Sequence, residues 1–204
     1  MSEEQTRMIG RLLSANSSEC VVSYVTGENE VPSFGAMVRM PLNGSDIEIF
    51  GIVADVKLEE DGFLRQIAGA PKLDNEVILD AQQNRNVPIV LRVLFLGYRE
   101  EDRMIHMLPP RPPLTLTEIF RCTETEVVQF TKKLGYLRLI LNVQNVRPAE
   151  LLAVHIHYAA KAHLDRGDTA WAEDALRELM YLMMDDYEGL TSVLAAVGDT
   201  DIFA

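Results

Sequence analysis

A run of prolines at residues 109–113 divides the chain into two parts whose hydrophobic patterns have different periods. Four of these five residues are proline, and the fifth is Arg111. Neither an α-helix nor a central β-strand accommodates such a run, because proline lacks the backbone N–H and its ring clashes with the preceding helical turn. The run favours a stiff, extended spacer. We therefore predict a β-domain over residues 1–108, a Pro-rich linker over 109–114 and a helical domain over 115–204.

The part before the prolines has the period of β-strands. Short runs that alternate apolar and polar residues are separated by turn residues, which is typical of a small barrel or sandwich. We favour an antiparallel barrel, because a closed sheet leaves no open edge beside a strand as apolar as Val87–Leu96. Gly51, inside a strand, and Gly35, at the start of another, fit tight corners or bulges. The expected strands lie at residues 8–13, 18–26, 36–42, 48–58, 87–97 and 103–108.

The part after the prolines has the period of helices. Thr123 and Glu126 have the spacing of a capping box, and Pro148 suits the first turn of a helix whose inner face carries Leu152, Ile156, Ala159 and His163. Residues 136–143 fit either a strand or a helix. Short connections predict antiparallel neighbours, with Asp168 or Thr169 as the N-cap of the second long helix. Helices are expected at residues 123–134, 148–164, 171–184 and 187–197.

The predicted fold is therefore α+β, a small antiparallel β-barrel followed by a bundle of three to four helices. The 204-residue chain carries 31 acidic and 19 basic residues, a net charge of −12, which disfavours direct binding to nucleic acid or to an anionic membrane. Neither a secretory signal nor a membrane helix is expected. Cys20 and Cys122 lie far apart without a CxxC partner, which indicates reduced, buried thiols. We expect a cytoplasmic protein.

Positive charge gathers in the middle of the chain. Residues 108–147 hold six basic and three acidic residues, whereas both flanking parts are acidic. Lys132 and Lys133 lie in the last turn of a predicted helix, where cations also suit the helix dipole without any ligand. Arg92 is isolated in an apolar strand, and alternation directs it outward, where it would lie at a subunit contact if the chain forms a ring. The candidate interface or phosphate-facing residues are Arg92, Arg121, Lys132, Lys133, Arg138 and Arg147.

No motif for catalysis, a metal or a cofactor is visible. The chain has neither a P-loop nor a dinucleotide-binding glycine pattern, and it lacks the Gly-x-Ser-x-Gly of a nucleophile elbow. His155 and His157 point about 200° apart on a helix, so they cannot clasp one ion. His106 and His163 have no carboxylate or cysteine partner at ligand spacing. We therefore predict no catalytic residue, no metal, no cofactor and no enzymatic activity.

Three stretches carry a family resemblance. They are residues 8–40 (MIGRLLSANSSECVVSYVTGENEVPSFGAMVRM), residues 47–62 with the Gly-x-Val-x-x-Val of Gly51, Val53 and Val56, and residues 109–130, where prolines lead to a short strand and a capped helix. Together they resemble the HAS-barrel, the small N-terminal barrel of HerA-type DNA-translocating ATPases and of rotary ATP synthases. In that family an ATPase core follows the barrel, whereas here acidic helices follow.

The resemblance implies a barrel without catalysis that helps subunits assemble and docks proteins. We expect an interaction module that caps, recruits or regulates a separately encoded HerA-like ring ATPase, or that forms a homo-oligomer. The alternative is a barrel that binds single-stranded nucleic acid through the basic belt at residues 121–147. A third hypothesis is an enzyme or a small-ligand protein that uses the barrel mouth or the crevice between barrel and helices, where pockets commonly form.

Overall fold

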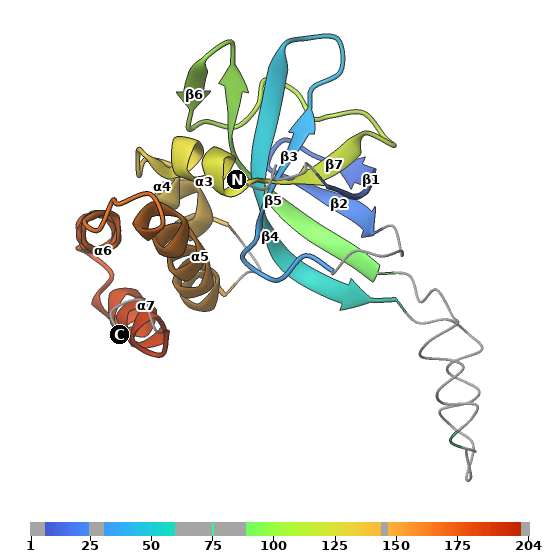
Figure 1. Cartoon of the computed structure of the whole chain (residues 1–204). Helices are drawn as coiled ribbons and strands as arrows, with labels where there is room; N and C mark the ends of the chain where they lie inside the picture. The colour runs from blue at the N-terminus through green and yellow to red at the C-terminus, as the bar shows by residue number, and fades with distance from the viewer. Residues whose placement is uncertain (1–6, 25–30, 60–74, 76–88, 144–146, 201–204) are drawn as a thin grey trace.

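A β-barrel and a layer of helices beside it make up the computed structural model (Figure 1). The structure describes residues 7–24, 31–59, 75, 89–143 and 147–200. This confirms the α+β class and the order of a barrel followed by helices. Among the described residues, no helix combines the length and the apolar character needed to cross a membrane.

Six antiparallel strands close the barrel in the order β2-β1-β7-β3-β4-β5, and β5 pairs back with β2. The short β6 extends the sheet beyond β5. Each strand expected before the prolines is present, although residues 25–26 and 87–88 of the expected strands lie outside the described residues. The bounds are β1 (Met8–Ala15), β2 (Glu19–Tyr24), β3 (Met37–Pro41), β4 (Ile47–Leu58), β5 (Ile89–Glu100), β6 (Arg103–Ile105) and β7 (Glu118–Arg121).

The strand that closes the barrel, β7, lies after the prolines. It pairs with β1 at Met8–Phe120 and with β3 at Val38–Arg121, so it fills the gap between those two strands. The sheet therefore does not end at residue 108. The Pro-rich run joins two strands of one sheet, β6 and β7, and packs on the barrel: Pro113 is buried, and the guanidinium of Arg111 donates to the carbonyl of Asn43 at 2.7 Å.

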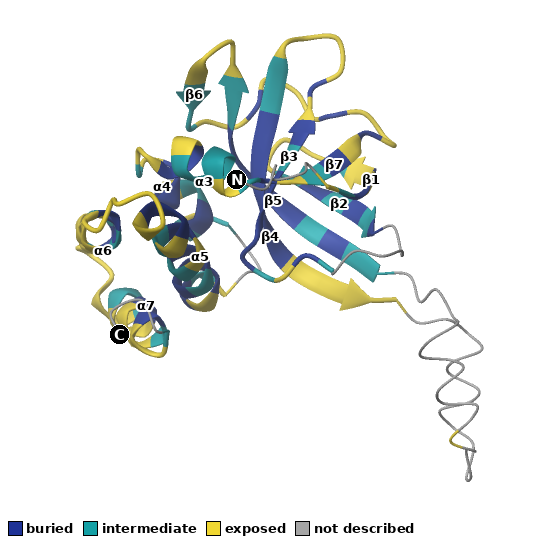
Figure 2. Ribbon diagram, viewed as in Figure 1, coloured by how far each residue is buried: buried dark blue, intermediate teal, exposed yellow. Residues whose placement is uncertain are grey.

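Strands β4 and β5 are buried on both faces. Along β5, Val93 and Phe95 lie in the core inside the barrel, whereas Leu94 and Leu96 belong to a second core shared with the helices. Figure 2 shows the buried middle of both strands and the exposed outer end of β4. This explains the long apolar run of β5, because a strand covered on both sides needs no polar face.

Five helices follow β7 in the described part of the chain: α3 (Glu124–Thr131), α4 (Leu137–Leu141), α5 (Pro148–Leu164), α6 (Trp171–Leu182) and α7 (Tyr187–Gly198). The capping box, the early Pro148 and the buried face of α5 are confirmed. The ambiguous residues 136–143 contain a helix, α4. The N-cap prediction for α6 was wrong: Ala170 occupies that position without a side-chain cap, because the carboxylate of Asp168 contacts His163.

Two glycines permit close backbone approaches. Gly51 lies at a register shift between β4 and β5, as expected, and an added Cβ would come within 2.6 Å of Val93 Cγ1. Gly35 precedes β3 with a φ of +82°, and its Cβ would come within 2.7 Å of Val154 Cγ1 on α5. The second glycine therefore lets the barrel lie directly against α5.

Comparing Gly35→Ala with Gly167→Ala tests this approach. Gly167 has nearly the same φ, +83°, but nothing lies within 4 Å of its added Cβ. Gly167→Ala should therefore carry only the left-handed backbone cost of about 1–2 kcal/mol. Gly35→Ala should lower the free energy of unfolding by about 1–3 kcal/mol more, through overpacking. Urea unfolding measures both changes, and equal losses would contradict the close packing.

Candidate functional site

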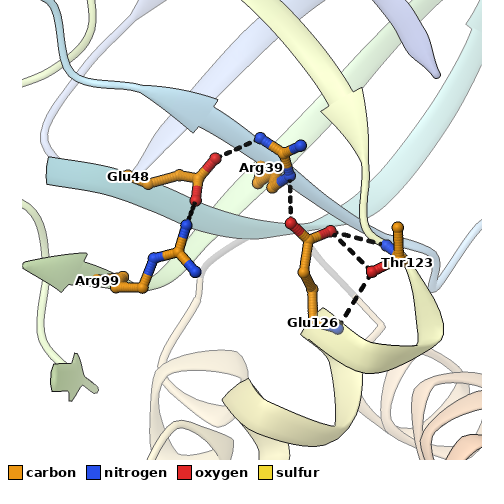
Figure 3. A network of polar contacts seen from close by, with 5 residues as sticks. All are labelled: Arg39, Glu48, Arg99, Thr123 and Glu126. Atoms are coloured by element: carbon orange, nitrogen blue, oxygen red, sulfur yellow. Dashed lines mark hydrogen bonds and ion pairs between the residues drawn. The ribbon is translucent and has the colours of Figure 1, made fainter. Parts of the chain in front are cut away.

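An ion-pair network connects the barrel to α3 (Figure 3). Arg39 on β3 contacts Glu48 on β4, which also contacts Arg99 on β5. From the same side chain, Nε of Arg39 lies 2.7 Å from Oε1 of Glu126 on α3. The backbone N–H of Thr123 donates to Oε2 of Glu126 at 2.8 Å, so one carboxylate serves both the cap and the ion pair.

The network is balanced and largely sheltered from solvent. Two guanidinium groups face two carboxylates, and the side chains of Arg39, Glu48 and Glu126 are only 14–16% exposed. Hydrogen bonds between opposite charges in such surroundings are stronger than those between neutral groups. Because each charge is compensated within the network, its role is to orient α3 on the sheet rather than to recruit a ligand.

A buried histidine, His155 on α5, lies at the junction of barrel and helices. Its Nε2 is 2.8 Å from the hydroxyl of Tyr136. Burial lowers the pKa of His155 to about 4, although the backbone of Gly35 acts in the opposite direction, so the ring is neutral at pH 7. If the buried phenol donates to Nε2, the ring proton lies on Nδ1; the reverse arrangement would leave the phenol proton without an acceptor.

His163, near the end of α5, corrects an expectation. It was predicted to have no carboxylate or cysteine partner at ligand spacing, but Nδ1 lies 2.9 Å from Oδ2 of Asp168 and Nε2 lies 2.9 Å from Oγ1 of Thr131. The ring also stacks on Trp171 at 4.7 Å between centroids. Burial lowers the pKa of His163. The signal available in the sequence was Gly167, whose turn brings the next residue back over the helix end.

The other groups that invite a chemical role are also packed into the fold. Nε2 of His106 lies 3.0 Å from the carbonyl of Phe130, a hydrogen bond within the fold. Cys20 and Cys122 are free thiols and buried, as expected. Burial raises the pKa of both thiols, that of Cys20 to about 12. Among the described residues, no group of three His, Cys, Asp or Glu side chains could hold a metal ion.

A cavity of about 570 Å³ lies where the barrel meets α3 and α5. Three basic side chains line it, those of Arg7, Arg121 and Lys161, together with one carboxylate, that of Glu124. No ion pair with a described carboxylate engages any of the three cations. The remaining lining residues are Ser33, Gly35, Ala36, Met37, Cys122, Thr123, Val127, His155, Tyr158, Ala159 and Ala162.

The predicted basic belt is spread over different surroundings. Arg121 lines the cavity, whereas the charges of Lys133 and Arg138 act on His106, and Arg138 also donates to the His106 carbonyl at 2.7 Å. Lys132 is exposed at the C-cap of α3, and Arg147 is exposed at the N-cap of α5. Sequence reasoning missed the other two cations of the cavity, Arg7 and Lys161, because they come from distant segments.

Arg92 faces outward but has a partner within the chain. Its Nη2 lies 2.6 Å from Oε2 of Glu19, and the two side chains are about a quarter exposed. Glu19 lies on β2 and Arg92 lies on β5, so the ion pair links the two strands whose pairing joins the ends of the strand order β2-β1-β7-β3-β4-β5. A subunit contact through Arg92 stays a prediction.

No protein-family model matches the chain, and no curated protein matches it significantly. The resemblance to the HAS-barrel therefore rests on the residue patterns alone.

A double-mutant cycle between Arg39→Met and Glu126→Gln tests the network. Glutamine retains an oxygen that can accept from the Thr123 amide, so the cycle isolates the charge interaction from the cap. We expect a coupling of roughly 0.5–3 kcal/mol in urea unfolding. The matched control is the exposed pair of Arg11 and Glu118, 3.3 Å apart, which should couple by less than about 1 kcal/mol. Similar values for the two pairs would contradict the special position of Arg39.

Stability should fall in acid because of His155. The unfolded chain takes up a proton at the ordinary pKa of 6.5, whereas the folded chain resists it until the pKa of about 4. The stabilisation is therefore complete above pH 6.5 and is lost as the pH falls toward 4, by up to about 3 kcal/mol. Unfolding free energies of wild type and His155→Gln, measured from pH 7 to 4, should converge; parallel curves would refute this assignment.

Proposed function

We propose that the chain is a non-catalytic assembly module of the HAS-barrel type, which docks a separately encoded HerA-like ring ATPase or further copies of itself. The proposal is supported by the closed barrel with a helical layer on one side and by an exposed apolar surface on the barrel.

The observation that carries the proposal is the conformation of Leu116. Its φ is +66°, a left-handed value that costs a residue other than glycine about 1–2 kcal/mol. Its side chain is nonetheless 66% exposed. Strain in a backbone persists only where the surroundings enforce it, and it often marks a functional segment. Here the Leu116 amide donates to the carbonyl of Leu12 at 2.8 Å, which holds the leucine outward beside β1.

Two further leucines extend this surface. Leu13 points away from the barrel interior, because its neighbour Leu12 is buried, and Leu114 is also exposed. We call Leu13, Leu114 and Leu116 the leucine patch. The exposed ion pair of Arg11 and Glu118 lies beside it, since both residues flank the patch on β1 and β7. An apolar centre with a polar rim is typical of a protein interface.

The nucleic-acid alternative finds less support. Single-strand binding requires a continuous basic groove with stacking aromatic residues. Of the belt residues, Arg121 instead lines the cavity, Lys133 and Arg138 lie near His106, and Lys132 and Arg147 lie at helix ends. A gel shift with single-stranded DNA at low salt that disappears in Lys132→Ala plus Lys133→Ala would favour this alternative.

Replacing the patch should abolish docking without unfolding the barrel. In the variant Leu114→Ser plus Leu116→Asn, asparagine relieves the left-handed strain, so the unfolding temperature should not fall. Light scattering of the chain alone, and co-purification with a co-expressed HerA-like ATPase, should show association of wild type that weakens at least about tenfold in the variant.

The matched control is Leu58→Ser, because Leu58 is as exposed as Leu116 but lies at the outer end of β4. It should associate like wild type. A strictly monomeric wild-type chain that captures no ATPase, or association unchanged in the patch variant, would refute the proposal.

A further inference from the structure

We propose that the cavity between the barrel and α5 is a binding site for a phosphate monoester of a small organic molecule. This inference is independent of docking through the leucine patch, because the two features share no residue.

The charge of the cavity favours an anionic ligand. The cavity concentrates three cations and one carboxylate in a chain whose net charge is −12. Five guanidinium groups elsewhere are paired with carboxylates, those of Arg11, Arg39, Arg92, Arg99 and Arg177. Arg111 and Arg138 instead donate to backbone carbonyls, so it is the gathering of three cations in one cavity that distinguishes this site. A phosphate monoester carries a charge of about −1.5 to −2 at pH 7, which matches the surplus of positive charge in the lining.

Backbone and helix geometry bring the three cations of the cavity together. The amide of Arg121 at the end of β7 donates to the carbonyl of Arg7 at 3.0 Å, so the two arginines are neighbours. Lys161 lies three residues after Tyr158 on α5, so the two side chains share a face of the helix, and both line the cavity. Arginine side chains present several N–H donors in a plane, which suits phosphate oxygens.

The size and the apolar wall of the cavity suit the rest of the ligand. A volume of about 570 Å³ lies within the roughly 300–1,000 Å³ that is usual for pockets holding organic ligands. Met37, Val127 and Ala159 supply apolar wall, and the half-exposed ring of Tyr158 lies at the rim. The site is therefore suited to a phosphate that carries an organic group rather than to a phosphate ion alone.

Calorimetric titration and thermal shift of the full chain test the proposal. The probes are adenosine 5′-monophosphate and glucose 6-phosphate, with inorganic phosphate, adenosine, citrate and sodium chloride at equal ionic strength as comparisons. We expect at least one ester to raise the unfolding temperature and to bind with a Kd below about 1 mM. Inorganic phosphate should bind more weakly, and adenosine should not bind.

Charge-removing variants decide whether binding takes place in the cavity. Arg121→Gln and Lys161→Gln should each weaken binding about tenfold or more. Lys132→Gln plus Lys133→Gln removes exposed charge outside the cavity and should leave the Kd unchanged. Arg121 and Lys161 are both exposed, so neither substitution removes a core side chain. If Arg121→Gln unfolds, the Kd of Lys161→Gln alone tests whether the ligand binds in the cavity.

Three results would overturn the proposal. They are the absence of any ester binding, an equal loss in the Lys132 and Lys133 control, and binding of inorganic phosphate or citrate that is at least as tight as that of both esters.

Discussion

The pairing of β7 between β1 and β3 is the constraint on which the rest of the structure depends. Only four residues long, this strand supplies the hydrogen bonds that close the barrel. The chain passes from it directly into Thr123, so the position of β7 also decides where α3 begins. That start places Glu126 beside Arg39, and the ion-pair network then holds the helix against the sheet. A polar cap and a sheet closure are thus parts of one local arrangement.

The helices complete the barrel rather than form an independent unit. Strands β4 and β5 contribute one face to the barrel interior and the other to the core shared with the helices, where Phe50 stacks on Phe130 at 4.9 Å between ring centroids. Removing the helices would expose that second face to water. The two parts that the prolines separate in the chain are therefore coupled through burial of common strands.

Both proposed binding surfaces adjoin β7. The leucine patch includes Leu116 just before the strand, and the cavity includes Arg121 at its end. The first surface is apolar and exposed, which suits a protein partner, whereas the second is a basic cavity, which suits a small anion. Because the two proposed surfaces adjoin opposite ends of β7, a small ligand in the cavity would not compete with a protein partner on the leucine patch.

The sequence by itself determined most of the element types, because period-2 and period-3.6 patterns, the capping box of Thr123 and the early Pro148 reflect forces between near neighbours in the chain. It left residues 136–143 open between strand and helix. It also indicated closure and the Gly51 bulge. Only the tertiary structure decided that β7 joins the barrel, that Asp168 contacts His163 rather than capping α6, and that Arg7, Arg121 and Lys161 share a cavity. These arrangements depend on which distant segments pack together, and neither periodicity nor local spacing encodes that choice.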